Sequence, residues 1–256
     1  MIEAEGGEIP FDLPRVTGAQ RERAAALLKA LRQRYPDARC ALRYTAPHEL
    51  LVATILSAQT TDIGVNKATP ALFARFPKPA DYARATAAEI EPYVRSLGFF
   101  RNKARAVQAA MSEVATIHGG ETPRRMDDLL ALRGVARKTA NVVLGNAFGI
   151  NVGVVVDTHV ERLSKRMGLA PAKSTVAAIE RRLMALFPRE SWTDLSHLLI
   201  AHGRAVCKAR GALCAEDEIC RRFCSNAKAM RRAGSPKRAK PAKNTARRNA
   251  PVGRKA

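Results

Sequence analysis

Residues 132–149 give the clearest indication of the fold. Their sequence is LRGVARKTANVVLGNAFG. An apolar helical segment ends at Leu132, a tight turn of four residues (133–136) follows, and a second helical pattern starts at once. Two helices joined by so short a turn form a helical hairpin. The turn and the first residues of the second helix then present backbone N–H groups outward, which suits a phosphate group. An ordinary helix connection is the alternative interpretation.

Lys138 lies in the first turn of the second helix of this hairpin. The positive end of the helix dipole and partial burial would both disfavour a charged ammonium group there. A neutral amine is a nucleophile. The residues alone therefore leave two roles open for Lys138: a nucleophile, or one more phosphate-contacting cation beside Arg133 and Arg137.

Helical periodicity continues outward from the hairpin through most of the chain. Thr17 and Gln20 have the spacing of a capping box before the first helix. The one strand-like run is 152–156, and one strand cannot form a sheet. We therefore expect an all-α protein without internal repeats. Its predicted helices span residues 19–34, 47–57, 66–75, 86–97, 102–118, 126–132, 138–148, 158–167, 174–187 and 192–206.

Asp157 ends the apolar run VVV (154–156) at the point where a helix is predicted to begin. A helix cap is its plain role, but Thr158 and Glu161 have capping-box spacing and could do the same. That would leave the carboxylate of Asp157 available for a catalytic role. Close to Lys138, its carboxylate could assist proton transfer and stabilise a cationic, sugar-like transition state.

The charge of the chain is strongly positive. Lys and Arg number 44 against 23 Asp and Glu, for a net charge of +21, and residues 227–256 hold eleven of these cations and no acid. Such a balance points to nucleic acid as the partner. No apolar run approaches the roughly 18 residues of a membrane span, so no membrane partner is expected. The acidic first residues are unlike a secretory leader, so we expect a cytoplasmic protein.

Four of the five cysteines lie within eighteen residues, with the spacing Cys207-x6-Cys214-x5-Cys220-x3-Cys224, and Cys40 lies alone. In a reducing compartment such a cluster indicates a metal site more often than disulfides. Four thiols can supply a complete tetrahedral shell. Both zinc and an iron-sulfur cluster fit that chemistry.

Several motifs together resemble the endonuclease III family, the bifunctional DNA glycosylases and lyases of the helix-hairpin-helix superfamily. The resemblance covers residues 19–226 and rests on the hairpin, the cysteine loop, LLVATILSAQTTD (50–62), LGFFRNKA (97–104), VDTHVERL (156–163) and HGRAVC (202–207). It implies two helical domains flanking a DNA-binding cleft. By this resemblance, residues 40–150 form a six-helix domain with the helix-hairpin-helix, and residues 19–39 and 151–226 form an iron-sulfur cluster domain. An acidic extension (1–18) and a basic disordered tail (227–256) lie outside these domains.

The resemblance also implies a reaction. The family removes oxidised pyrimidines from duplex DNA and cleaves the strand 3′ to the abasic site by β-elimination, through a lysine Schiff base. Lys138 matches the nucleophile and Asp157 the essential aspartate. Gln59 matches the residue that fills the gap left by the flipped base, and Phe99 the apolar wedge. The remaining residues expected to contact DNA are Arg133, Gly134, Ala136, Arg137, Thr139 and His159.

The resemblance further implies a [4Fe-4S] cluster on Cys207, Cys214, Cys220 and Cys224, a monomer, and association with the nucleoid through DNA. Two departures concern the site. Arg133 and Ala136 replace the usual Pro and second Gly of the hairpin, and the usual cysteine spacing is x6, x2, x5. Two alternatives stay open: a monofunctional glycosylase for another base, and a helix-hairpin-helix protein that binds DNA without catalysis.

Overall fold

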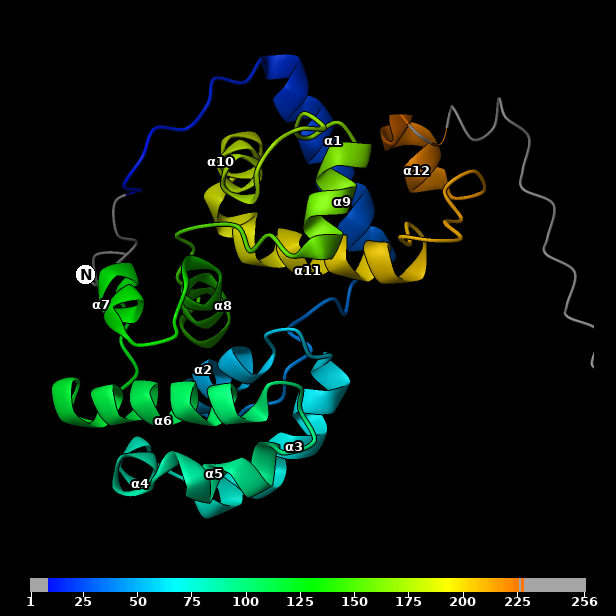
Figure 1. Ribbon diagram of the computed structural model, residues 1–256. Coiled ribbons are helices and arrows are strands. Elements are labelled where there is room, and N and C mark those ends of the chain that lie inside the picture. Colours follow the sequence, from blue (N-terminus) through cyan, green and yellow to red (C-terminus); the bar gives the residue numbers. More distant parts are fainter. Residues whose placement is uncertain (1–8, 226, 228–256) are drawn as a thin grey trace, which may run out of the picture.

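The protein is all-helical, as the sequence predicts. The computed structural model describes residues 9–225 and 227, and over these residues it contains helices and no strand (Figure 1). Its elements are α1 (Gly18–Arg34), α2 (Pro47–Leu56), α3 (Asp62–Arg75), α4 (Pro79–Arg84), α5 (Ala87–Val94), α6 (Phe100–Ile117), α7 (Met126–Ala131), α8 (Arg137–Phe148), α9 (Thr158–Arg166), α10 (Val176–Leu186), the short 3₁₀ helix η1 (Arg189–Ser191), α11 (Trp192–Ala205) and α12 (Glu218–Phe223).

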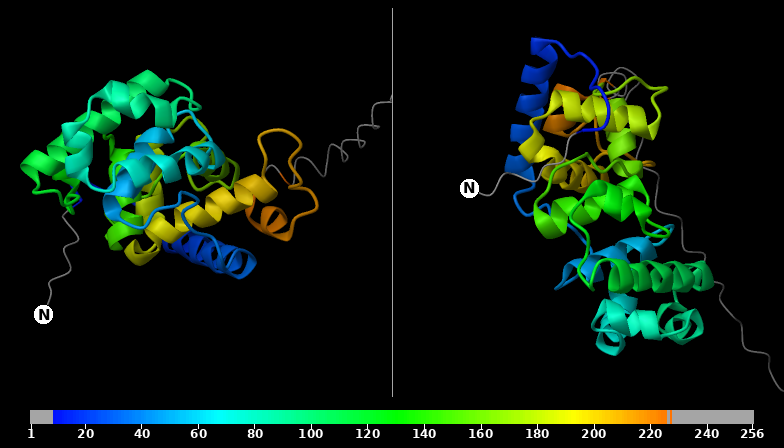
Figure 2. Two further views of the ribbon diagram at one scale, coloured as in Figure 1. Left: turned by 90° about the horizontal axis from the view of Figure 1, so that it is seen from below. Right: turned by 90° about the vertical axis from the view of Figure 1, so that its left-hand side faces the viewer.

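The buried apolar side chains form two separate cores. One core is built by α2 to α8, with α6 packed against α4 and α5. The other is built by α1, α9, α10, α11 and α12, so the first helix of the chain packs with the last ones. Figures 1 and 2 show the two groups of helices as two lobes, joined where α8 approaches α11. The domain boundaries expected from the sequence stay a prediction. The two cores follow this division, except that Ile9, Phe11, Leu13 and Val16 of the expected N-terminal extension pack against the second core.

The predicted capping box at the start of α1 is confirmed. Thr17 Oγ1 accepts from the Gln20 backbone N–H at 3.2 Å, and Gln20 Oε1 accepts from the Thr17 N–H at 3.0 Å. Each side chain therefore satisfies a backbone donor that the first helical turn leaves without a partner.

The helix α3 begins four residues earlier than the sequence pattern predicts. Thr61 caps it, with its Oγ1 accepting from the Gly64 N–H at 3.2 Å. The first turn hides this start, because it contains Gly64, which is a poor helix former, and because Ile63 is apolar but exposed and so falls outside the buried face. The helices α4 and α12 were not predicted. Each has six residues, less than two helical turns, and so carries only a weak periodic signal, although α7, which has the same length, was predicted.

The apolar run 152–156 is extended and buried, but no described strand pairs with it. Val152 belongs to the first core, whereas Val154 and Val156 belong to the second. The run is thus a buried connection between the two lobes. It ends at Asp157, which lies at their junction. No described helix is both long and apolar enough to cross a membrane.

Candidate active site and metal centre

The helical hairpin consists of α7, the turn 132–136 and α8. Gly134 has φ +81°, a conformation that side chains disfavour, and a Cβ built on it would lie 3.2 Å from the Ala106 Cβ of α6. Glycine is therefore required here. Ala136 has φ −96°, so the alanine that replaces the usual glycine fits without strain.

The N-terminus of α8 is open. Its N-cap residue, Ala136, has no side chain that could accept a hydrogen bond, and its first turn holds no acid. Gly134, Ala136 and Lys138 are exposed at this end. The Arg133 N–H is already used, since it donates to Glu113 Oε2 at 2.7 Å. The first N–H groups of α8 itself thus remain for an anion, which the helix dipole also attracts.

A small pocket of about 130 Å³ at the junction of the two lobes brings Lys138 and Asp157 together. Lys138 comes from the first turn of α8 and Asp157 from the residue before α9, so two elements far apart in sequence meet at one cavity. Lys138 is exposed rather than partly buried, which differs from the expectation. An amine at the mouth of a pocket can reach a molecule that enters from outside. A larger cavity elsewhere contains neither residue.

Asp157 is the N-cap of α9. Its Oδ1 accepts from the backbone N–H groups of His159 and Val160, each at 2.8 Å. The expectation that Thr158 relieves Asp157 of this role was wrong, because Thr158 is already the first residue of the helix. The cap uses Oδ1 only, and it holds the carboxylate in one orientation. Asp157 can therefore cap α9 through Oδ1 and still take part in a reaction through Oδ2.

The side chains of Asn146 and His197 also line this pocket. His197 Nε2 and Asn146 Oδ1 lie 2.7 Å apart, and Asn146 Nδ2 donates to the Val142 carbonyl at 2.8 Å. The amide oxygen is then the acceptor, so Nε2 of His197 carries the hydrogen. Burial lowers the pKa of His197. A neutral, oriented imidazole at a pocket wall suits hydrogen bonding to an uncharged ring.

Gln59 and Phe99 share an unusual backbone conformation. They are the two described non-glycine residues with positive φ, at +52° and +58°. Both are exposed, and Phe99 presents 65% of its surface to solvent. Strained conformations of this kind persist where the surrounding structure enforces them, and they cluster at functional sites. Only the resemblance singled out these two residues, since local patterns suggested a helix end and a core aromatic.

Lys103 links the two segments that carry Gln59 and Phe99. Its Nζ donates to Thr60 Oγ1, next to Gln59, and its backbone N–H donates to the Phe99 carbonyl at 3.1 Å. Lys103 is buried, and burial lowers its pKa. The Lys103 side chain therefore connects the turn after α2, which carries Gln59, to the first turns of α6, which follow Phe99. This contact favours a fixed distance between the two segments.

The other residues expected at DNA have different surroundings. Arg133 is exposed and Thr139 half-buried. Arg137 points inward and pairs with Glu180. His159 accepts at Nδ1 from Arg162 Nη2 at 3.1 Å, which leaves its Nε2–H as a donor. Burial lowers the pKa of His159, opposed by Asp157.

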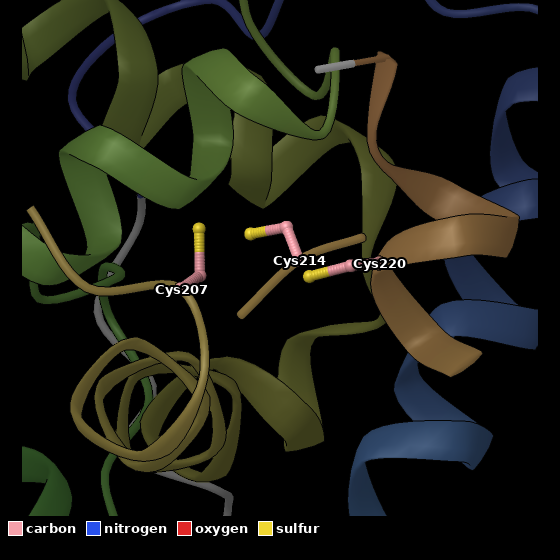
Figure 3. Close-up of side chains that lie close together, drawn as sticks. All are labelled: Cys207, Cys214 and Cys220. Carbon is pink, nitrogen blue, oxygen red and sulfur yellow. The ribbon is translucent and has the colours of Figure 1, made fainter. Parts of the chain in front are cut away.

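Three of the four clustered cysteines converge. The Sγ atoms of Cys207, Cys214 and Cys220 lie within 4.8 Å of one another, and Figure 3 shows them directed into one space. The fourth, Cys224, is buried in the same core and donates its thiol to the Arg166 carbonyl at 3.2 Å. Four buried sulfur donors in one core fit a thiolate-ligated metal group, which the sequence predicts here.

Two basic side chains contact these sulfurs. Arg166 Nη1 donates to Cys207 Sγ at 3.3 Å, and His202 Nε2 lies 3.3 Å from Cys220 Sγ. His202 is itself oriented by the Tyr35 hydroxyl, 2.9 Å from its Nδ1. A hydrogen bond from Cys220, aided by Arg166, lowers the pKa of Cys207. These contacts favour the thiolate form of Cys207, the form that binds metals, whereas burial raises the pKa of Cys214 and the hydrogen bond with Cys207 raises the pKa of Cys220. None of these partners was found from the sequence. Arg166 and Tyr35 lie far from the cysteine loop in the chain, and no local pattern marks the nearby His202 as a partner of Cys220.

The comparisons with known proteins agree with this architecture. Residues 52–189 match the HhH-GPD superfamily of base excision DNA repair proteins. The chain is 51% identical over 217 residues to the endonuclease III of Synechocystis sp., covering 85% of this chain and 98% of the relative. It is 39% identical to the endonuclease III of Escherichia coli strain K12, covering 73% and 88%.

Solved structures agree as well. A trapped covalent intermediate of an endonuclease III with DNA superposes with a TM-score of 0.78 at 39% identity, covering 85% of this chain and 100% of that chain. A non-covalent endonuclease III–DNA complex gives the same values. Helical fold, open hairpin and thiol cluster thus define a base excision repair protein of the HhH-GPD superfamily. Within it, the chain belongs to the endonuclease III family and is a DNA glycosylase/lyase.

Proposed function

We propose that this protein removes oxidised pyrimidines from duplex DNA and then cleaves the strand at the resulting abasic site, with Lys138 as nucleophile. The observation that carries the proposal is the shared pocket of Lys138 and Asp157 at the junction of the two lobes. The pocket is lined by an accessible amine and by a carboxylate that the helix cap orients. Its volume of about 130 Å³ is far below the ~300–1,000 Å³ of pockets for drug-sized ligands, so it suits a single flipped ring.

In the proposed reaction Lys138 Nζ, as a free amine, attacks C1′ of the flipped nucleotide. The bond between C1′ and the base breaks, and the base leaves with the electron pair and takes up a proton. The sugar ring opens to give a Schiff base between Lys138 and C1′. Loss of a proton from C2′ then expels the 3′ phosphate by β-elimination, and water finally releases the enzyme. Asp157 accepts the proton of the attacking amine and balances the positive charge on the sugar.

The exposed residues around the pocket have matching roles in this proposal. Gln59 fills the gap that the flipped base leaves, and Phe99 enters the stack as a wedge. The open N-terminus of α8 binds a phosphate, with Arg133 adding positive charge. The solvent exposure of both side chains supports this assignment, together with the positive φ of Gln59 and Phe99.

One assay tests the proposed function. A duplex with a single thymine glycol is incubated with the protein, and strand cleavage is followed on a denaturing gel with and without borohydride. We expect cleavage 3′ to the lesion, and a covalent protein–DNA adduct when borohydride reduces the Schiff base. Base release without an adduct would instead support a monofunctional glycosylase. DNA binding without either product would support a non-catalytic protein.

We further propose that Cys207, Cys214, Cys220 and Cys224 hold a [4Fe-4S] cluster. When bound, the cluster cross-links its loop through metal–thiolate bonds and so serves structure rather than base removal. The support is the convergence of three thiols, with a fourth buried nearby. Arg166 and His202 supply hydrogen bonds to the sulfurs.

The cluster proposal predicts a brown protein that contains iron. Cys214→Ser removes one of the converging thiols, and we expect loss of visible absorption and of most bound iron, together with a lower melting temperature. Iron analysis and absorption spectra of anaerobically prepared protein provide the measurement. Cys40→Ser is the matched control, since Cys40 lies outside the cluster and its change leaves the iron content intact. A colourless, zinc-containing wild type would contradict the proposal.

Apart from Ala227, the basic tail falls outside the described residues, and we propose that it binds DNA through its charge alone. Ala227 is buried in the second core, so a deletion that spares the fold removes residues 228–256. These hold eleven Lys or Arg and no acid. We expect deletion to weaken DNA binding at low salt and to lower the salt dependence of binding, because fewer counterions are released. Binding curves at several salt concentrations test this; an unchanged salt slope would contradict it.

A further inference from the structure

The carboxylate of Glu180 in α10 forms a buried network with α8. Both of its oxygens accept from Arg137 Nε, at 3.0 and 3.2 Å, and Oε1 also accepts from Asn141 Nδ2 at 2.9 Å. Glu180 is 7% exposed and Asn141 4%. Arg137 and Asn141 are one helical turn apart and lie on the same side of α8, on either side of Lys138 in the sequence. The network thus joins the helix of Lys138 to the other lobe.

The same network holds the segment that leads to Asp157. Arg137 Nη2 donates to the Val152 carbonyl at 3.4 Å. Next to it, a Cβ on Gly153 would overlap Glu180 Oε1 and would lie 2.6 Å from Asn141 Nδ2. Glycine is needed here because the backbone packs directly on the polar side chains. From Gly153 the chain runs through a buried apolar stretch to Asp157, four residues on.

Phe11 covers the outer side of this network. Its ring lies under the guanidinium groups of Arg137, 4.9 Å from the centroid, and of Arg181, 4.5 Å from the centroid. The Arg137 side chain is therefore enclosed by Glu180, Val152 and Phe11. Its position explains why this arginine, expected at DNA from the resemblance, points into the protein. The ion pair is largely withdrawn from water, with 27% of the Arg137 side chain and 10% of the Glu180 side chain exposed, and this desolvation offsets part of its contribution to stability.

We infer that Glu180 is a positioning residue for base removal and strand cleavage: its carboxylate fixes α8 and the segment 152–157 to one point, and so sets Lys138 against Asp157. It acts through Arg137, Asn141 and Gly153 and touches no substrate. This inference rests on the proposed function of Lys138. Misplacing reacting groups by about 1 Å can cost about 10²-fold in rate, so loss of the network is expected to affect chemistry before it affects DNA binding.

The test compares Glu180→Gln with wild type on duplexes with thymine glycol. Glutamine keeps the shape and can still accept from Asn141, but it no longer neutralises Arg137. Single-turnover rates at saturating protein, the rate of borohydride trapping, and the dissociation constant for DNA are measured well below the melting temperature of each variant. We expect rates about 10- to 100-fold lower, with the dissociation constant nearly unchanged. Glu180→Asp is expected to restore part of the rate.

Arg32→Gln is the matched control. It breaks the exposed ion pair of Arg32 with Asp194, which joins α1 to α11 and includes no residue that lines the pocket. We expect wild-type rates from this variant. If Glu180→Gln does not fold, Gly153→Ala provides a second disturbance of the same network. A Glu180→Gln variant that melts earlier but reacts at the wild-type rate would overturn the inference and leave the proposed function standing. A wild type that forms no adduct would overturn both.

Discussion

Lys138→Gln is expected to abolish the borohydride-trapped adduct and the β-elimination product. Without the amine no Schiff base can form, and the cleavage rate should fall at least about 10³-fold, as loss of a nucleophile does in other enzymes. Lys138 is exposed, so the melting temperature should stay close to that of wild type. Rate and adduct are measured on the same thymine glycol duplex under single-turnover conditions.

Lys173→Gln is the control for this variant, because it removes one exposed lysine from the connection between α9 and α10, away from the pocket. It should trap and cleave as wild type does. An adduct of undiminished yield in Lys138→Gln would show that another amine attacks the sugar, and the assignment of the nucleophile would then be wrong.

The second large effect is expected at Asp157, where two substitutions separate two roles. Asparagine caps helices as well as aspartate does, so Asp157→Asn should keep the stability of the fold while losing the charge. We expect its single-turnover rate to fall by about 10²- to 10⁴-fold, the usual contribution of a positioned acid or base. Asp157→Ala should show the same loss of rate and, in addition, a free energy of unfolding lower by about 0.5–2 kcal/mol, since its cap is gone.

Chemical denaturation gives the stabilities, and trapping assays give the rates. The pair is informative because both variants lack the carboxylate but only one lacks the cap. If Asp157→Asn reacted as fast as wild type, Asp157 would be a helix cap and no more, and the proton of Lys138 would need another acceptor.

The helical fold was accessible from the sequence because its signals are local. The capping box of Thr17 and Gln20, the glycine at Gly134 and the apolar periodicity each depend on a few neighbouring residues, and the structure bears them out. The prediction failed at the start of α3, whose first turn contains Gly64 and the exposed Ile63, and it missed two of the three six-residue helices, α4 and α12.

The site was accessible only in part. Lys138 and the clustered cysteines carry a signal in their own surroundings, whereas Glu180 looks like any charged residue on an amphipathic helix. Its importance comes from partners 27 to 43 positions away, and no local pattern records those contacts. The buried Lys103 is a similar case, because its partner Thr60 lies 43 positions earlier. Asp157 shows the opposite error: the local pattern offered two caps, and the structure uses the one that was set aside.

The left-handed conformations of Gln59 and Phe99 have a consequence for how damage is found. Each costs about 1–3 kcal/mol, and this cost is present before any DNA is bound. In the proposed insertion of these two side chains, the backbone that carries them already has its final conformation, so the protein presents the same shape to every base pair that it meets. A protein surface of constant shape does not distinguish one base pair from another through a conformational change of its own. Discrimination between bases then depends on the DNA, because a damaged or mispaired base leaves the stack at a lower free-energy cost than an undamaged one.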